Sequence, residues 1–437
     1  MRRLFCSESF GNNMLKNLFE KIFKPSEKKR LNVLLWGSTA RDHAIAWKLS
    51  QSEMLNKLYL VGPNDGYKNL GESVNADGYE LLKMAREKQI DLIVVGTEGA
   101  QIKGIADAFK KIGIKCIGVT KAWAQLEASK SFGKDFMTRN SILTPNYKLT
   151  YSFAEFENAI SKCSFPVVIK SDFIISNSGE GVLIANSIEE AMQAAEKFFS
   201  KHPVDIKNRV IIEEYIKGDE LSLISFWDGK TLVPLLPTKD YKKLLDWDKG
   251  PNTAGLGAYC PVKITEKKQK LISQYLKKLK KALKKEGADF TGIIYSGAMF
   301  DEKDMYILEF NIRLGDPEGQ VLLKHMDSDL LEIFYLMSKK QLSKVKIKWK
   351  EGISACVVIA GGGYPNLQSS GSKITLPKDE TIDVFYCGVK EEDNGLVSNG
   401  GRIMSVCKTS INPYNDIYNF VEKIEMDDKY YRKDIGK

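Results

Sequence analysis

Apolar runs alternate with amphipathic stretches along the first third of the chain. The segment 31–49 begins with LNVLLW and continues as a turn and a helix, and further apolar runs occupy 91–99 (DLIVVGTEG) and 113–120 (GIKCIGVT). Helical spacing separates them, at GYELLKMAREKQ and IKGIADAFKKI. Apolar strands that alternate with helices predict a parallel sheet covered on both faces. Ligands of such sheets lie beyond the carboxyl ends of the strands, where residues 37–43 and 96–99 fall.

From about residue 121 the pattern changes to shorter strands and glycine turns. FPVVIK at 165–170 predicts a strand that ends on a lysine, and SNSGEGVLIA at 176–185 predicts a glycine turn leading into another strand. RVIIEEYIKGDELSLISFWDG at 209–229 predicts two strands joined by KGDE. From about 352, short strands and turns precede a last helix near 413–425. We therefore expect an α/β protein of several units.

The composition is that of an ordinary globular protein, with 43% hydrophobic and 28% charged residues among 437. No apolar run approaches the ~18 residues that span a bilayer, so no membrane partner is expected. The seven cysteines form no CxxC pair and the histidines number three, which argues against a zinc site and favours reduced thiols in the cytoplasm. Residues 1–30 contain an amphipathic stretch that fits a membrane-surface or targeting helix or a poorly packed extension, and we expect the extension.

The net charge of +9 comes mostly from lysines, which are densest in residues 265–290. There Ile272, Leu276, Leu279 and Leu283 keep helical spacing while lysines fill the other face. A nucleic-acid surface would usually carry arginine and stacking aromatics, and this stretch has no arginine. We therefore expect a solvated helix face and no nucleic-acid partner.

The segment 308–320, LEFNIRLGDPEGQ, begins as a strand with alternating polar residues. Glu309, Asn311 and Arg313 then share one face, with about 7 Å between successive members. Oxygen ligands from Glu and Asn suit Mg²⁺, which keeps waters and uses substrate phosphates. An arginine beside them suits a phosphate or carboxylate. A strand with one solvent-facing side would show the same alternation, so the segment alone leaves both interpretations open.

Two lysines and a glycine turn favour a nucleotide triphosphate site. Lys170 ends an apolar strand, and Lys130 ends QLEASK before a helical pattern. Either lysine alone would usually be a surface residue. A turn at Gly179–Gly181 supplies backbone N–H groups that cradle phosphates, and the lysines would neutralise them. The segment IIEEYIKGDE (211–220) could pair with adenine through its backbone and with ribose through Glu220.

Six motifs occur in the order seen in the phosphoribosylamine–glycine ligase family, the glycinamide ribonucleotide synthetases: ARDHAIAWKL, VVGTEG, LEASKSFGKDFM, GPNTAGLGAY, LEFNIRLGDPE and ACVVIAGGGYP. The resemblance runs from about residue 31 to 425, and GPNT-G-GAY and EFN-R-GDPE are its most specific pieces. This family belongs to the ATP-grasp ligases. The resemblance implies, after an N-terminal extension (1–30), a Rossmann-like N-terminal domain (31–129), an ATP-grasp lid region (130–225), an ATP-grasp central domain (226–350) and a small C-terminal mixed β domain (351–437).

The resemblance implies an ATP-dependent carbon–nitrogen ligase of de novo purine biosynthesis. ATP would activate glycine as glycyl phosphate, and the amine of 5-phosphoribosylamine would attack it to give glycinamide ribonucleotide, ADP and phosphate. Such chemistry depends on positioning and charge neutralisation and needs no histidine base. Glycine and 5-phosphoribosylamine are the expected partners, ATP and Mg²⁺ (or Mn²⁺) the expected cofactors, and a cytoplasmic monomer the expected form.

The resemblance also implies roles for motif residues around one site. The metal ligands would be Glu309 and Asn311. The residues that contact ATP would be Lys130, Lys170, Gly179, Gly181, Glu213, Glu214, Ile216 and Glu220. Those that face glycine or the ribonucleotide would be Asn252, Arg313 and Asp316. The residues that help to place phosphoribosylamine would be Gly37, Gly96 and Glu98.

The sequence departs from the family on the acceptor side. The first turn reads GSTARDHA where glycines and a glutamate are usual, with Asp42 in place of the glutamate. Tyr241 and Lys243 replace a histidine and an arginine, and Ala254 replaces a glycine. We expect these residues near the glycine and ribonucleotide site.

The lid loop also departs from the family, because Glu180 stands where a lysine is usual. At ~5 Å and an effective dielectric of ~20, each unit of that charge change is worth about 3 kcal/mol against ATP binding. Three functions therefore stay open: the working ligase, a weakened or inactive relative that binds a nucleotide or phosphoribosyl ligand, and a ligase with another amine acceptor.

Overall fold

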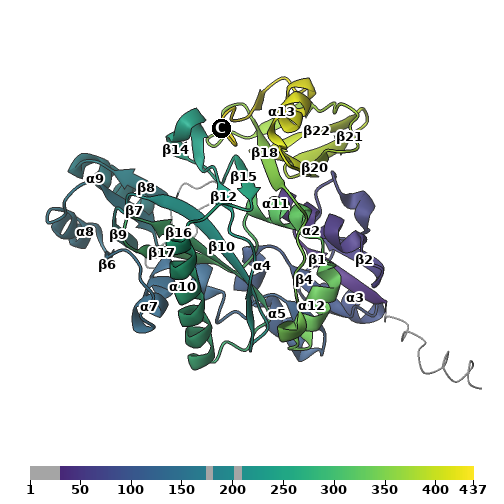
Figure 1. The fold of residues 1–437 in the computed structure, drawn as a ribbon, viewed down its shortest axis with the longest axis horizontal. Helices are drawn as coiled ribbons and strands as arrows, with labels where there is room; N and C mark the ends of the chain where they lie inside the picture. Colours follow the sequence, from purple (N-terminus) through teal and green to yellow (C-terminus); the bar gives the residue numbers. More distant parts are fainter. Residues whose placement is uncertain (1–29, 174–180, 201–208) are drawn as a thin grey trace, which may run out of the picture.

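The computed structural model describes residues 30–173, 181–200 and 209–437. Residues 1–29 of the expected extension, and the lid residues Gly179 and Glu180, lie outside the described residues. Within the described parts, no helix has the length and apolar character needed to cross a membrane. The predicted α/β class is confirmed, and Figure 1 shows the lid strands at one end and the N- and C-terminal units at the other.

The first unit is the predicted parallel sheet, with strand order β3-β2-β1-β4-β5. Both faces are covered, because Leu35 packs in one apolar cluster with α2 and Leu34 packs in another with α3 and α5. The elements are β1 (Leu31–Trp36), α2 (Ala40–Ser50), β2 (Leu55–Val61), η1 (Lys68–Leu70), β3 (Glu72–Val74), α3 (Gly78–Glu87), β4 (Leu92–Val95), α4 (Glu98–Ile102), α5 (Ile105–Lys111) and β5 (Lys115–Ile117).

The region expected to be the lid, called the lid below, contains an antiparallel sheet, β6-β9-β7-β8, whose apolar face packs on two helices around Phe156 and Phe198. The predicted strand at 165–170 is confirmed, shifted by one residue at its end, and Lys170 is the fourth of its five residues. The elements from the linker to the lid are α6 (Gln125–Ala128), α7 (Lys130–Arg139), β6 (Tyr147–Thr150), α8 (Phe153–Ile160), β7 (Val167–Ser171), β8 (Val182–Ala185), α9 (Ile188–Ser200) and β9 (Val210–Glu214).

The central unit is a second antiparallel sheet, β11-β10-β16-β17. The two strands predicted on either side of KGDE are β9 and β10, and they belong to different sheets. The lysine-rich segment is helix α10, whose Ile272, Leu279 and Leu283 are buried against the sheet. The elements are β10 (Asp219–Trp227), β11 (Leu232–Pro234), β12 (Lys239–Asp240), β13 (Lys243–Leu245), η2 (Asp246–Asp248), β14 (Lys249–Asn252), β15 (Gly257–Cys260), α10 (Glu266–Lys285), β16 (Gly292–Phe300), β17 (Met305–Asn311), α11 (Glu318–His325), α12 (Leu330–Ser338) and η3 (Leu342–Lys344).

The C-terminal sheet combines strands from both sides of residue 350. Its order is β12-β15-β18-β23-β20, with β24 also paired to β18, so β12 and β15 join a sheet whose other strands follow residue 350. A smaller sheet, β19-β22-β21, lies beside it. The elements are β18 (Ile353–Gly361), β19 (Ser369–Lys373), β20 (Asp383–Tyr386), β21 (Val389–Glu392), β22 (Gly395–Gly400), β23 (Arg402–Ser410), α13 (Tyr414–Lys423) and β24 (Lys429–Tyr430).

Candidate active site

A cavity of about 680 Å³ lies where the N-terminal turn, the lid, the central sheet and the C-terminal sheet meet. Its volume is in the range of small-molecule sites. It is lined by the expected metal and nucleotide residues that the structure describes, and by three residues of the acceptor side: Lys130, Lys170, Gly181, Glu213, Glu214, Ile216, Glu220, Asn252, Glu309, Asn311, Arg313 and Asp316. Glu98 also lines it, whereas Gly37 and Gly96 lie outside its lining. The face of Glu309, Asn311 and Arg313 therefore lines a cavity rather than open solvent.

Lys170 is held on the lid side of the cavity by a buried glutamate. Strands β7 and β9 pair with Val168 opposite Glu213, so the Lys170 and Glu213 side chains are diagonal neighbours on one face. Lys170 Nζ donates to Glu213 Oε1 at 2.7 Å, and Lys134 Nζ lies 2.6 Å from Glu213 Oε2. The Glu213 carboxylate is thus shared by two lysines, and its side chain is 1% exposed.

Lys134 is a site residue that the sequence analysis missed. It lies one helical turn after Lys130 on α7, its side chain is 1% exposed, and its Nζ also donates to Thr144 Oγ1 at 2.7 Å. Burial and the repulsion of Lys170 lower the pKa of Lys134 to about 8, against the attraction of Glu213. The i, i+4 spacing of the lysines in SKSFGK was the available signal, because it places both on one helix face.

Glu309 is surrounded by cations. Burial alone would raise its pKa, but the attraction of Lys242, Lys170 and Lys130 holds the pKa of the carboxyl below its ordinary value. Two of these lysines are themselves paired elsewhere, Lys170 with Glu213 and Lys242 with Glu220. The Glu309 carboxylate is therefore ionised and available to a metal ion.

The rest of the motif strand fits a hard cation that also uses substrate oxygens. The pairing of β16 with β17 shifts register between Gly297 and Ala298, which places a bulge just before Glu309. The NH₂ group of Asn311 faces Glu127 and donates to Glu127 Oε1 at 3.0 Å. The amide oxygen of Asn311 therefore faces away from Glu127. Among the described residues no three His, Cys, Asp or Glu side chains converge as a metal cage. One carboxylate and one amide oxygen suit Mg²⁺ bound largely by water and phosphates.

Arg313 follows the end of β17 and is engaged by two acids of the N-terminal half. Its Nη2 lies 2.9 Å from Glu127 Oε1 and its Nε lies 3.3 Å from Glu98 Oε2. Although burial opposes its charge, Glu127 and Glu98 raise the pKa of the guanidinium. Glu127 Oε2 also accepts from Ile312 N at 2.8 Å, so this unpredicted glutamate fixes the end of the motif strand.

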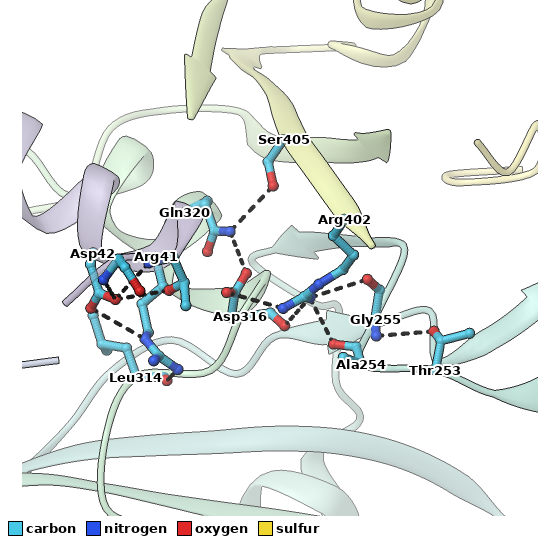
Figure 2. Close-up of polar contacts among 12 residues, drawn as sticks. Arg41, Asp42, Thr253, Ala254, Gly255, Leu314, Asp316, Gln320, Arg402 and Ser405 are labelled. Atoms are coloured by element: carbon cyan, nitrogen blue, oxygen red, sulfur yellow. Dashed lines mark hydrogen bonds and ion pairs between the residues drawn. The ribbon is translucent and has the colours of Figure 1, made fainter. Parts of the chain in front are cut away.

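Asp316 is tied to the C-terminal sheet (Figure 2). Arg402 Nη2 lies 3.1 Å from Asp316 Oδ2, and Gln320 Nε2 donates to Asp316 Oδ1 at 2.7 Å. Burial alone would raise the pKa of Asp316, but Arg402 and Arg41 hold it below its ordinary value. Arg402 was not predicted, because it lies 86 residues after Asp316 and only the fold brings the two together.

Of the acceptor-side residues that differ from the family, Tyr241 does not lie where we expected it. Lys243 lines the cavity, but Tyr241 faces the C-terminal tail, where its hydroxyl accepts from Gly436 N at 3.0 Å. The expectation for Tyr241 was therefore wrong, because its ring packs in the apolar cluster of the C-terminal sheet, near Tyr259 and against the Arg432 guanidinium. The residue beside it, Lys242, faces the cavity and pairs with Glu220.

The first turn is filled by the side chain of Asp42. One of its oxygens, Oδ2, accepts from Ser38 N and Thr39 N at 3.0 Å and from Thr39 Oγ1 at 2.9 Å. A Cβ at Gly37 would lie 2.2 Å from the Asp42 carboxyl carbon, and one at Gly96 would lie 1.8 Å from its other oxygen. Both glycines therefore make room for this carboxylate, whose pKa burial raises.

Comparisons with known proteins agree with this geometry. The chain matches the N domain, ATP-grasp (A) domain and C domain of phosphoribosylglycinamide synthetase over residues 31–127, 128–319 and 354–437. It is 38% identical over 419 residues to the phosphoribosylamine–glycine ligase of Clostridium acetobutylicum, covering 93% of this chain and 100% of that protein.

Solved structures give the same answer. The crystal structure of phosphoribosylamine–glycine ligase from Thermotoga maritima matches with a TM-score of 0.82 and 32% identity, over 92% of this chain and 100% of that chain. A biotin carboxylase domain from Hydrogenobacter thermophilus, in complex with MgADP, shares the fold with a TM-score of 0.72 at 14% identity, over 93% of this chain and 92% of that chain. The resemblance inferred from the motifs is confirmed: this chain belongs to the phosphoribosylglycinamide synthetase family of ATP-grasp ligases.

Proposed function

We propose that this chain ligates glycine to 5-phosphoribosylamine through glycyl phosphate, at the expense of ATP and with Mg²⁺. The observation that carries the proposal is that Glu309 and Asn311 line one cavity together with Lys130, Lys170 and the other family motifs. The family membership and the near full-length match to phosphoribosylamine–glycine ligases support the same substrates.

The lid and central residues would bind and neutralise the nucleotide. Lys130 and Lys170 would contact its phosphates, and Glu213 holds Lys170 in position for that contact. The segment Glu214–Ile216, at the end of β9, lines the cavity and would frame adenine. Glu220, paired with Lys242, would accept from the ribose hydroxyls.

Glu309 and Asn311 would hold Mg²⁺ at the phosphate end of this nucleotide site. When bound, the ion supplies charge neutralisation for the transferring phosphoryl group. The nearby cations, Lys130 and Lys170, oppose the same negative charge from the protein side. Because these groups are fixed before substrate binds, they lower the cost of bringing ATP next to the glycine carboxylate.

The acceptor side is formed by Asn252, Arg313 and Asp316, which line the cavity beyond Glu309. Their role would be to orient glycine and the ribonucleotide, because an amine held in line attacks an acyl phosphate without a strong base. Arg313 and Asp316 are held by protein partners rather than by solvent, as their ion pairs with Glu127 and Arg402 show.

The proposal is tested by ADP release from ATP, glycine and freshly made phosphoribosylamine, with each omitted in turn. We expect ADP release to need glycine, and Glu309→Gln to lower Mg²⁺-dependent turnover by ~10²–10³-fold. The exposed Glu302→Gln, in the turn before β17, is the matched control and should turn over like the wild type.

Nucleotide binding without glycine-dependent ADP release would favour the non-catalytic relative instead. Turnover that needs glycine but proceeds with a different amine would favour another acceptor. Unchanged turnover in Glu309→Gln would remove the metal assignment.

A further inference from the structure

Arg402 reaches from the C-terminal sheet into two loops of the acceptor side (Figure 2). It is the first residue of β23, and its side chain is 12% exposed at the wall of the cavity. Its Nη1 donates to the carbonyl oxygens of Ala254 and Asp316, each at 2.8 Å, and of Gly255 at 3.3 Å. Its Nη2 lies 3.1 Å from the Asp316 carboxylate. One guanidinium thus joins the GPNTAG loop to the GDPE loop.

The two loops approach each other more closely than ordinary residues allow. Gly255 has φ +104°, and a Cβ there would lie 2.6 Å from Pro317 Cδ and 3.4 Å from the Asp316 carbonyl oxygen. Three carbonyl oxygens and a carboxylate oxygen converge at this contact. Oxygen atoms so close together repel one another, and leaving them unpaired in a buried place is costly. A cation at their centre removes both costs.

An arginine suits this position better than a lysine would. The planar guanidinium presents its N–H groups in a fixed fork, so it can hold several oxygens in set directions at once. A lysine ammonium is a point charge on a flexible stem and cannot fix the separation of the two loops in the same way. Because the polar contacts of its guanidinium are with the two loops, Arg402 acts through them.

We propose that Arg402 is a positioning residue for the acceptor half of the reaction. It sets the separation of Asn252 and Asp316, which line the cavity from the two loops. Lys130, Lys170 and Glu213 lie on other elements, so nucleotide binding does not depend on Arg402. The expected kinetic effect rests on the proposed function, whereas the restraint on the two loops can be measured without substrates.

The test combines kinetics with amide exchange in Arg402→Lys and Arg402→Ala. We expect the Kd for a non-hydrolysable MgATP analogue to stay within ~2-fold of wild type, and kcat/KM for glycine and phosphoribosylamine to fall ~10²-fold. Free guanidinium should restore part of the Arg402→Ala activity. Hydrogen–deuterium exchange should be faster at the 250–256 and 313–317 loops and unchanged at β9.

The matched control is Lys408→Ala, which removes a cation from the same strand. Lys408 pairs with Asp416 at 2.7 Å, away from the cavity, so its loss should change neither the kinetics nor the exchange of the two loops. Wild-type kcat/KM in both Arg402 variants would overturn the inference, as would equal losses in nucleotide affinity and turnover without guanidinium rescue. If the wild type releases no ADP with glycine, the proposed function fails, and unchanged loop exchange would still overturn the role of Arg402.

Discussion

Single buried charges decide how the nucleotide side of the cavity is organised. Glu213 was expected to frame adenine, and the structure places its carboxylate between Lys170 and Lys134. The sequence could indicate a lysine at the end of a buried strand, because burial and charge are visible in the residue pattern. It could not indicate which carboxylate would hold that lysine, because the diagonal contact depends on the register of β7 with β9.

The depressed pKa of Lys134 predicts a specific pH dependence of stability. Its ordinary pKa is 10.5 and its value in the fold is about 8, so between these values the unfolded chain binds more protons than the folded one. Raising the pH through this interval therefore favours folding, by at most about 1.4 kcal/mol per pH unit. From pH 7 to 10, the free energy of unfolding of the wild type should rise relative to that of Lys134→Met.

Lys148→Met serves as the control for that titration, since it removes an exposed lysine from a strand of the lid sheet. The wild type and Lys148→Met should then follow the same curve. A difference between wild type and Lys134→Met that does not change with pH would contradict the assignment.

At the scale of elements, the motif loops depend on backbone conformation as much as on side chains. Ala254 departs from the family, yet its backbone does not have a positive φ, so an alanine Cβ is accommodated there. Its neighbour Gly255 has both a positive φ and a close approach to Pro317. The glycine spacing of GPNTAG predicts a tight loop, but which glycine is indispensable follows only from the partner loop.

Gly255→Ala should therefore cost more than a glycine substitution in an equally left-handed turn. The comparison is Gly395→Ala, where φ is +108° and a Cβ would meet nothing within 4 Å. We expect Gly255→Ala to lower the free energy of unfolding by about 1–3 kcal/mol more than Gly395→Ala, because only the former also overpacks the loop contact. Denaturant unfolding of the two variants measures the difference, and equal losses would show that backbone conformation alone is involved.

At the scale of the whole molecule, the units are joined by shared sheets rather than by linkers alone. Strands β12 and β15 precede residue 350, yet β15 pairs with β18 from Gly257–Val357 to Cys260–Ser354. Helix α11 packs against β15, β18 and β23 as well as α2. The boundary expected at 350–351 stays a prediction, and the hydrogen bonds of the C-terminal sheet cross it.

A chain ending at residue 350 should consequently not fold as a stable unit. It would leave the edge of β15, and the side of α11 that packs on β18 and β23, without partners. Exposed strand edges and apolar surfaces favour aggregation. We expect rapid proteolysis and no cooperative thermal transition for this shortened chain. Cooperative unfolding at the temperature of the full chain would contradict the shared-sheet description.

The sequence by itself determined the fold class, the family and most of the motif residues that meet in one cavity. The fold class follows from periodicity and glycine placement, and the family and its site residues follow from the resemblance of the motifs. Only the tertiary structure decided the partners: Glu213 with two lysines, Arg313 with Glu98 and Glu127, and Arg402 with two distant loops. The reason is physical, since an ion pair needs atoms within a few ångströms of each other, and strand register, a bulge and sheet order set those distances between segments far apart in the chain.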